Sequence, residues 1–183
     1  MIEFDIFDFK DQNLLSIFLS SKNIRLIEST MVLLNLIVSD REGANYIIQN
    51  LTNIQKLIEI LFTEDKDSYL RQQILAIIQK LSFKREVQNI LIENSVIEWI
   101  IDKISKPETL SNFTLEYATA LLMNLAIRTS GKDRCENPSI RIIEKLKNLL
   151  TFPFTQIRTY VNGTLYSLMS RKSLKEEAFV IVT

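Results

Sequence analysis

Histidine is absent from this sequence, and cysteine occurs once, at Cys135. The lack of histidine excludes Ser-His and Cys-His nucleophile pairs, histidine general bases and histidine metal ligands. A single cysteine excludes an internal disulfide and a cysteine-based zinc site, and it favours a reducing compartment. Lys132 and Arg134, close by in the sequence, predict a lowered pKa for the Cys135 thiol. Without a histidine partner the thiol is not expected to be catalytic, so we expect no enzyme and no cofactor or metal.

Glycine and proline are also scarce, with 3 of each in 183 residues. Sheets joined by tight turns usually need more of both, so a mainly helical fold is favoured. The 22 basic residues balance the 22 acidic ones, and nothing in the total charge favours nucleic acid or an anionic membrane as a partner. The longest apolar stretch, residues 31–38, is interrupted by Asn35 and is too short to span a bilayer. Residues 1–5 are acidic and do not resemble a signal peptide.

The sequence repeats itself with a period near 44 residues. Residues 41–50 align with residues 85–94, with five of the ten positions identical. A second pattern, aliphatic-x-[Asn/Lys/Ser]-Leu, occurs four times, and we call its third positions the ladder: Asn35, Lys80, Asn124 and Ser167. Successive ladder positions are 45, 44 and 43 residues apart. This period is typical of armadillo or HEAT repeats and is too long for TPR repeats.

Apolar spacing predicts three helices in each repeat. Long helices are expected at 24–38, 68–83, 113–128 and 155–169, each preceded by a shorter one at 12–19, 54–62, 96–104 or 140–150. A further short helix is expected at 41–48 and at 85–92. Gly131 is expected to end the third long helix, and residues 130–137 to form the longest irregular loop.

Three helices per repeat favour armadillo over two-helix HEAT repeats. We therefore expect an all-α, armadillo-type superhelical solenoid of about four repeats, forming a single array over residues 1–183. The expected repeats are about 10–39, 40–83, 84–129 and 136–170, followed by a partial C-terminal helix at 173–183.

In armadillo solenoids the long third helix lines a concave groove. Counting by four and seven from the ladder gives the other positions on the same face. The predicted partner-binding residues are Asn35, Lys80, Lys84, Tyr117, Asn124, Arg128, Tyr160 and Arg171. Amides, two tyrosines and a mostly basic row predict binding of an extended acidic segment. Three alternatives remain open: the asparagines hold repeats together, the small residues between the rows only allow close packing, and the basic row is a solvated face.

The same face predicts two further properties. Charge reversal at Lys80, Lys84 and Arg128 is expected to weaken partner binding and to leave the melting temperature nearly unchanged. Nuclear import of basic cargo is not expected, because the tryptophans that import receptors carry four residues before the ladder are replaced here by Met31, Ala76, Ala120 and Gly163.

From Leu115 onward the sequence resembles a particular family. The residues that carry the resemblance are Leu-Glu-Tyr-Ala-Thr-Ala-Leu-Leu-Met-Asn-Leu at 115–125, then Arg128, Thr129, Gly131, Lys132 and Cys135, then Ile-Arg-x-Tyr-Val-Asn-Gly-x-Leu-Tyr-Ser at 157–167 and Glu176, Glu177 and Ala178. They are similar to the armadillo region of the ciliary LisH-domain family called armadillo repeat-containing protein 9. The specific resemblance covers about 65 residues, and residues 1–110 resemble armadillo repeats only in general.

The resemblance implies a non-enzymatic scaffold in the cytoplasm and cytoskeleton, at the ciliary basal body, the centriole and the ciliary tip. It implies roles in cilium assembly and stability and in microtubule modification, with a TOG-domain microtubule-binding protein as partner. The LisH motif and coiled coil of that family are not in this sequence, so dimerisation through LisH is not carried over. The apolar residues 179–183 lead us to expect a segment of a longer protein. The alternatives are direct binding of tubulin tails or microtubules and a general armadillo adaptor unrelated to cilia.

Overall fold

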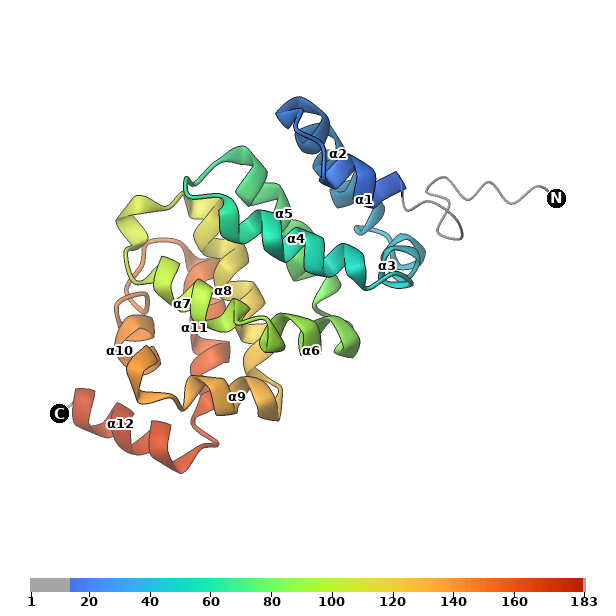
Figure 1. Ribbon diagram of the computed structural model, residues 1–183. Helices are drawn as coiled ribbons and strands as arrows, with labels where there is room; N and C mark the ends of the chain where they lie inside the picture. Colours follow the sequence, from blue (N-terminus) through green and yellow to red (C-terminus); the bar gives the residue numbers. More distant parts are fainter. Residues whose placement is uncertain (1–13, 183) are drawn as a thin grey trace. The chain divides into compact units, whose positions relative to one another are not determined.

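The computed structural model describes residues 14–182, and in that range all regular secondary structure is helical (Figure 1). The chain divides into two compact units, an N-terminal unit up to Leu81 and a C-terminal unit from Ser82 onward. Among residues 14–182 no helix combines the length and the hydropathy that crossing a membrane requires.

The N-terminal unit contains five helices in its described part. They are α1 (Leu14–Leu19), α2 (Ile24–Ile37), α3 (Arg41–Ile48), α4 (Thr52–Thr63) and α5 (Tyr69–Leu81). The first long helix, α2, begins after Asn23, whose side chain accepts a hydrogen bond from the backbone N–H of Arg25, an N-cap that satisfies one free donor. It packs against α5, the second long helix, and Met31 and Ile74 are buried in the core of this unit.

The C-terminal unit, over its described residues 82–182, contains seven α-helices and two 3₁₀ turns. They are α6 (Arg85–Glu93), α7 (Val96–Ile104), η1 (Pro107–Thr109), α8 (Asn112–Ala126), α9 (Thr129–Cys135), η2 (Pro138–Ile140), α10 (Ile142–Lys147), α11 (Thr155–Leu168) and α12 (Lys172–Val182). The two long helices α8 and α11 lie side by side (Figure 1). Gly163 allows this approach, because a Cβ there would lie 2.5 Å from the Met123 sulfur.

The arrangement of three helices per repeat is confirmed. The triplets are α3–α4–α5, α6–α7–α8 and α9–α10–α11, each ending in a long helix. The predicted long helices agree with α2, α5, α8 and α11 to within two residues at each end. Period-3.6 apolar patterning was sufficient to find them, because each long helix buries a continuous apolar stripe.

Two sequence predictions between the third and fourth long helices are wrong. Residues 130–137 are not the longest loop, because α9 occupies Thr129–Cys135, and Gly131 lies buried within it. The predicted helix at 140–150 is split, because Arg141 adopts the left-handed conformation (φ 52°) between η2 and α10. Polar α9 has no apolar period to reveal it, and a left-handed non-glycine residue interrupts helical hydrogen bonding.

Two arginines hold the turns that precede long helices. Arg71 lies nine residues before the ladder residue Lys80, is 2% exposed, and donates a hydrogen bond to the carbonyl of Glu64. Arg158 lies nine residues before Ser167 and donates to the carbonyls of Phe152 and Pro153, at 2.6 and 2.9 Å. Equivalent positions of two repeats therefore use a guanidinium to pair carbonyls that no helix satisfies.

Candidate partner-binding surface

The ladder residues of the N-terminal unit, Asn35 and Lys80, are hydrogen-bonded to each other and to side chains of α2 and α5 or next to them. The Lys80 ammonium donates to Asn35 Oδ1 at 2.6 Å and to Ser39 Oγ at 2.8 Å, and Asn35 Nδ2 donates to Gln73 Oε1 at 2.7 Å. Burial lowers the pKa of Lys80. Lys80 is therefore part of the packing between α2 and α5. The expectation that its charge can be reversed without cost to the fold is corrected, because an introduced carboxylate would face Asn35 Oδ1.

The ladder of the C-terminal unit is also used within the protein. Asn124 is 5% exposed, and its Nδ2 donates to Ser82 Oγ at 2.8 Å. Ser167 Oγ donates to the carbonyl of Ala126, also at 2.8 Å. These bonds join each long helix to the previous repeat, which is the first of the alternatives left open above. The role of Asn35 and Asn124 in partner binding stays a prediction.

Tyr117 and Tyr160, the predicted aromatic anchors, lie near one another in the C-terminal unit. Burial raises the pKa of Tyr117, and Glu116 and Tyr160 add smaller contributions in the same direction. Phe113, one helical turn before Tyr117, stacks on it with ring centroids 4.4 Å apart. Sequence reasoning missed Phe113, although its i, i+4 spacing from Tyr117 is the signal that places both on one face of α8.

The predicted basic row of the C-terminal unit contains both neutralised and uncompensated charges. The Arg171 guanidinium is paired with Asp133 and Glu136 and also donates to the carbonyl of Thr129 at 3.2 Å. Lys84 and Arg128 make no ion pair with a carboxylate of the part of the chain that the structure describes. The positive surface therefore depends on which cations are not paired with a carboxylate. The spacing of residues in the sequence does not reveal this pairing.

Lys132 joins these two cations, although it was not among the predicted groove residues. Its ammonium donates to Ser170 Oγ at 2.9 Å, and it too makes no ion pair with any carboxylate in residues 14–182. We call Lys84, Arg128 and Lys132 the basic edge.

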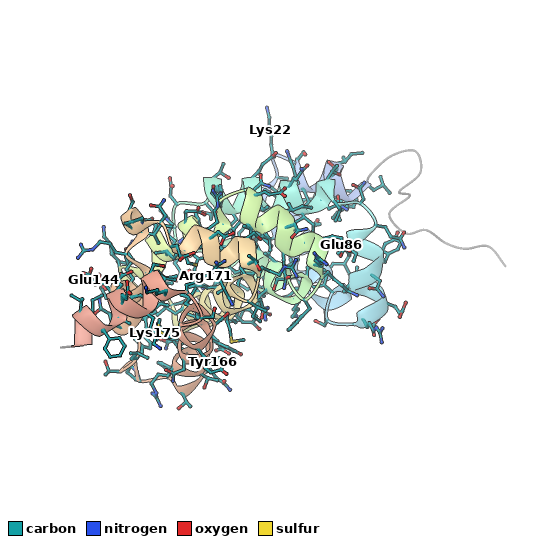
Figure 2. The ribbon with its side chains drawn as sticks, turned by 90° about the horizontal axis from the view of Figure 1, so that it is seen from below. Lys22, Glu86, Glu144, Tyr166, Arg171 and Lys175 are labelled. Carbon is teal, nitrogen blue, oxygen red and sulfur yellow. The ribbon has the colours of Figure 1, made fainter. Side chains whose placement is uncertain are left out.

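A hollow of about 660 Å³ opens on the C-terminal unit beside the basic edge. Its lining is formed by Met123, Ile127, Lys132, Gly163, Tyr166, Ser167, Met169 and Ser170. Ile127 and Tyr166 are 61% and 88% exposed, and Figure 2 shows Tyr166 at the margin of this unit. Periodicity alone did not reveal the hollow, because half of its lining, Met123, Ile127, Tyr166 and Ser170, lies one residue before the counted positions.

The sequence matches one particular family of armadillo repeat proteins. The sequence profile of the family "LisH domain-containing protein ARMC9, ARM repeats" matches residues 91–182. This chain belongs to that family. The resemblance found in the sequence is confirmed, and it extends upstream of Leu115.

Individual ARMC9 proteins match over most of the chain. The LisH domain-containing protein ARMC9 of Bos taurus is 39% identical over 160 residues, which is 87% of this chain and 24% of the relative. The Homo sapiens protein is 40% identical over 80% of this chain and 18% of its own length. The Rattus norvegicus protein is 38% identical over 95% of this chain and 24% of its own length. The chain thus spans about a fifth to a quarter of the length of these curated relatives.

Solved structures show that this ARMC9-family chain has the armadillo fold. A designed armadillo repeat protein superimposes with a TM-score of 0.70 at 16% identity, over 85% of this chain and 63% of that protein. Another, solved in complex with the peptide (KR)4, gives a TM-score of 0.67 at 15% identity over the same shares. The all-α armadillo class is therefore confirmed, and an ARMC9-type armadillo region indicates a protein-interaction scaffold.

The pKa of the Cys135 thiol in this ARMC9-family chain is raised, whereas the sequence predicted that it is lowered. Cys135 is 1% exposed, and its pKa is raised to about 12, first by burial and then by Glu98 and Glu136. The prediction of a lowered pKa is wrong, because burial of the thiol outweighs the nearby cations, of which Arg134 pairs with Glu98 at 3.0 Å and Lys132 bonds Ser170.

We expect Cys135 to resist alkylation in the native protein. At about pH 8, a pKa of about 12 leaves roughly one thiol in ten thousand ionised, and burial blocks the reagent. Mass spectrometry after iodoacetamide treatment should find the native chain unmodified and the urea-unfolded chain fully modified. Native alkylation at the rate of free cysteine would contradict this account of the thiol.

Proposed function

We propose that this chain is a non-enzymatic interaction module that holds a partner protein through its C-terminal unit. The observation that carries the proposal is the basic edge beside the apolar hollow, since exposed apolar surface of this kind marks interaction sites. The ladder side chains are already occupied in joining repeats. Within residues 14–182 no group of three or more acidic or cysteine side chains is arranged to hold a metal ion.

The proposed partner is an extended acidic segment. An armadillo structure similar to this chain was solved with a basic peptide, (KR)4, which gives a precedent for peptide binding by the fold. The charges here have the opposite effect, since the half-buried cations Lys84, Arg128 and Lys132 would repel a basic peptide and attract an acidic one. Membership of the ARMC9 family supports a place of action at the ciliary basal body, centriole and tip, with a TOG-domain microtubule-binding protein as partner.

Direct binding of tubulin is the second candidate function. Tubulin tails are acidic, and the observation that favours this function is that the three cations of the basic edge pair with no carboxylate of residues 14–182. The test is cosedimentation of the chain with microtubules over a range of ionic strengths. Binding that falls as salt is raised supports this function, because salt screens the attraction between charges. At 0.1 M salt the screening length is about 10 Å, and it shortens as the salt concentration rises. No cosedimentation at low salt would contradict it.

The experiment for the scaffold function is proximity labelling with full-length protein in ciliated cells. A variant with Lys84→Glu, Arg128→Glu and Lys132→Glu is run in parallel, and Lys80 is left intact because it belongs to the packing of α2 on α5. Enrichment of basal-body and TOG-domain proteins that the variant loses supports the proposal. No ciliary enrichment contradicts the ciliary role and leaves a general armadillo adaptor. Ciliary enrichment that the variant keeps contradicts the basic edge as the binding surface.

A further inference from the structure

The hollow on the C-terminal unit is apolar where it is most exposed. Met123 and Met169 contribute flexible thioether side chains, and Ile127 and Tyr166 lie at its surface, 61% and 88% exposed. Burying large apolar groups against such side chains is favourable, and methionine adapts its shape to different partners. The surface is therefore suited to one bulky apolar side chain from outside.

The charge in the lining of the hollow is positive. Lys132 is the charged residue of its lining, and Arg128 follows the lining residue Ile127 directly. Among residues 14–182, the buried Arg128 Nε has no hydrogen-bond partner, and the Lys132 ammonium donates to the hydroxyl of Ser170 alone. A carboxylate would be a stronger acceptor than that hydroxyl, because its negative charge adds Coulomb attraction to the hydrogen bond that the ammonium donates.

The pairing of an exposed apolar residue with a following cation occurs in two successive repeats. Phe83 is 72% exposed and precedes Lys84, and Ile127 is 61% exposed and precedes Arg128. The two pairs are 44 residues apart, which is one repeat. A segment that alternates acidic and apolar residues would satisfy both pairs, whereas an all-acidic segment would leave the apolar members uncovered.

We propose that the hollow lined by Met123, Ile127, Gly163, Tyr166 and Met169 is an anchor site for one bulky apolar side chain, held by an acidic segment of a partner protein whose carboxylates pair with Arg128 and Lys132. The proposal rests on the proposed function and adds a specific determinant to it. Charge complementarity brings the segment to the surface and the apolar anchor selects it.

The experiment measures binding of two fluorescein-labelled peptides to the full chain by fluorescence anisotropy. The first is Asp-Glu-Asp-Phe-Asp-Glu-Asp, and the second replaces its phenylalanine with alanine. The hollow variant carries Ile127→Ser and Tyr166→Ser. Its matched control carries Leu36→Ser and Tyr69→Ser, an aliphatic and a tyrosine of the N-terminal unit that are 68% and 52% exposed. Because all four side chains are largely exposed, the variants should fold, which circular dichroism melting checks.

The wild-type chain should bind the phenylalanine peptide at least tenfold more tightly than the alanine peptide. The hollow variant should lose at least tenfold in affinity for the phenylalanine peptide and should no longer distinguish the two, while the control variant stays within about twofold of wild type. This coupling between the peptide ring and the hollow is what a double-mutant cycle isolates.

Charge is tested separately with Lys132→Ser, and Lys22→Ser is its control at an exposed lysine that projects from the N-terminal unit (Figure 2). Lys132→Ser should weaken both peptides by the same factor. If it does so while the hollow variant binds like wild type, the anchor site is overturned, and binding of an acidic segment by the basic edge stands.

If neither peptide binds wild type, both the anchor site and the basic edge are overturned. If wild type sediments as a dimer and the hollow variant as a monomer, the hollow is covered by a second copy of this chain and the proposal is overturned.

Discussion

Replacing Gly131 with alanine is expected to lower the free energy of unfolding by about 3 kcal/mol. Gly131 lies inside α9, where alanine would ordinarily stabilise a helix by about 1 kcal/mol over glycine. Here a Cβ would overlap the carbonyl oxygen of Leu125 near the end of α8, well under the 3.0 Å that real Cβ atoms keep. The carbonyl is backbone and cannot rotate away, so α8 and α9 must separate. Urea unfolding followed by circular dichroism measures the loss.

The matched control is Gly163→Ala in α11. A Cβ at Gly163 also meets an atom too closely, but that atom is the sulfur of Met123, the far end of a flexible side chain. Met123 can move, so the loss should be about 1 kcal/mol or less. Equal stability of Gly131→Ala and wild type would show that the α8–α9 junction yields easily and would contradict the packing account.

Gly131 also shows where sequence reasoning succeeded and where it failed. Gly43 occupies the same place in α3 two repeats earlier, 88 residues away, and a Cβ there would overlap the carbonyl of Ile37. Val87, fully buried, takes the corresponding position in α6. The repeat was visible in the sequence, but a glycine near a helix end was read as a terminator, because only the folded chain brings the neighbouring carbonyl close.

The helices were largely predictable because burial of an apolar stripe determines them. Helix α9 was not, since its sequence Thr-Ser-Gly-Lys-Asp-Arg-Cys has no apolar period. Long-range contacts position it instead: Arg134 donates to the carbonyl of Ile92 at 3.2 Å and to Ser95 Oγ at 3.0 Å. Ser95 is in the left-handed conformation, so this bond also supports the turn between α6 and α7.

The partner-binding site stays a prediction, and the sequence could name its cations but not their contacts. Counting along the long helices placed Lys80 on the ladder and Lys84, Arg128 and Arg171 on the row four residues later. In the fold, Lys80 bonds Asn35 and Arg171 pairs with Asp133, whereas Lys84 and Arg128 make no ion pair in the described residues. Which cations remain available for a partner depends on side-chain contacts across about 40 residues, which periodicity does not encode.

Arg71→Met should destabilise the protein by about 3 kcal/mol. Burial lowers the pKa of the Arg71 guanidinium, and Asp67, Glu64 and Asp65 act in the opposite direction. The cation is therefore buried beside three carboxylate residues, and its hydrogen bond to the Glu64 carbonyl fixes the turn into α5. Methionine keeps most of the side-chain length but donates nothing, so the carbonyl loses its partner and the carboxylates lose a neutralising charge.

Arg158→Met is the matched control, because Arg158 occupies the equivalent position near the start of α11 and is half-buried. Water can replace its bonds to the carbonyls of Phe152 and Pro153, so the loss there should be about 1 kcal/mol. Buried ion pairs are sometimes replaced by apolar residues without cost. If Arg71→Met were as stable as wild type in urea, the free-energy cost of burying the cation would equal the benefit of its bonds. That result would contradict the claim that Arg71 stabilises the turn into α5. A larger loss at Arg71 than at Arg158 would establish burial, and not repeat position, as the source of the stabilisation.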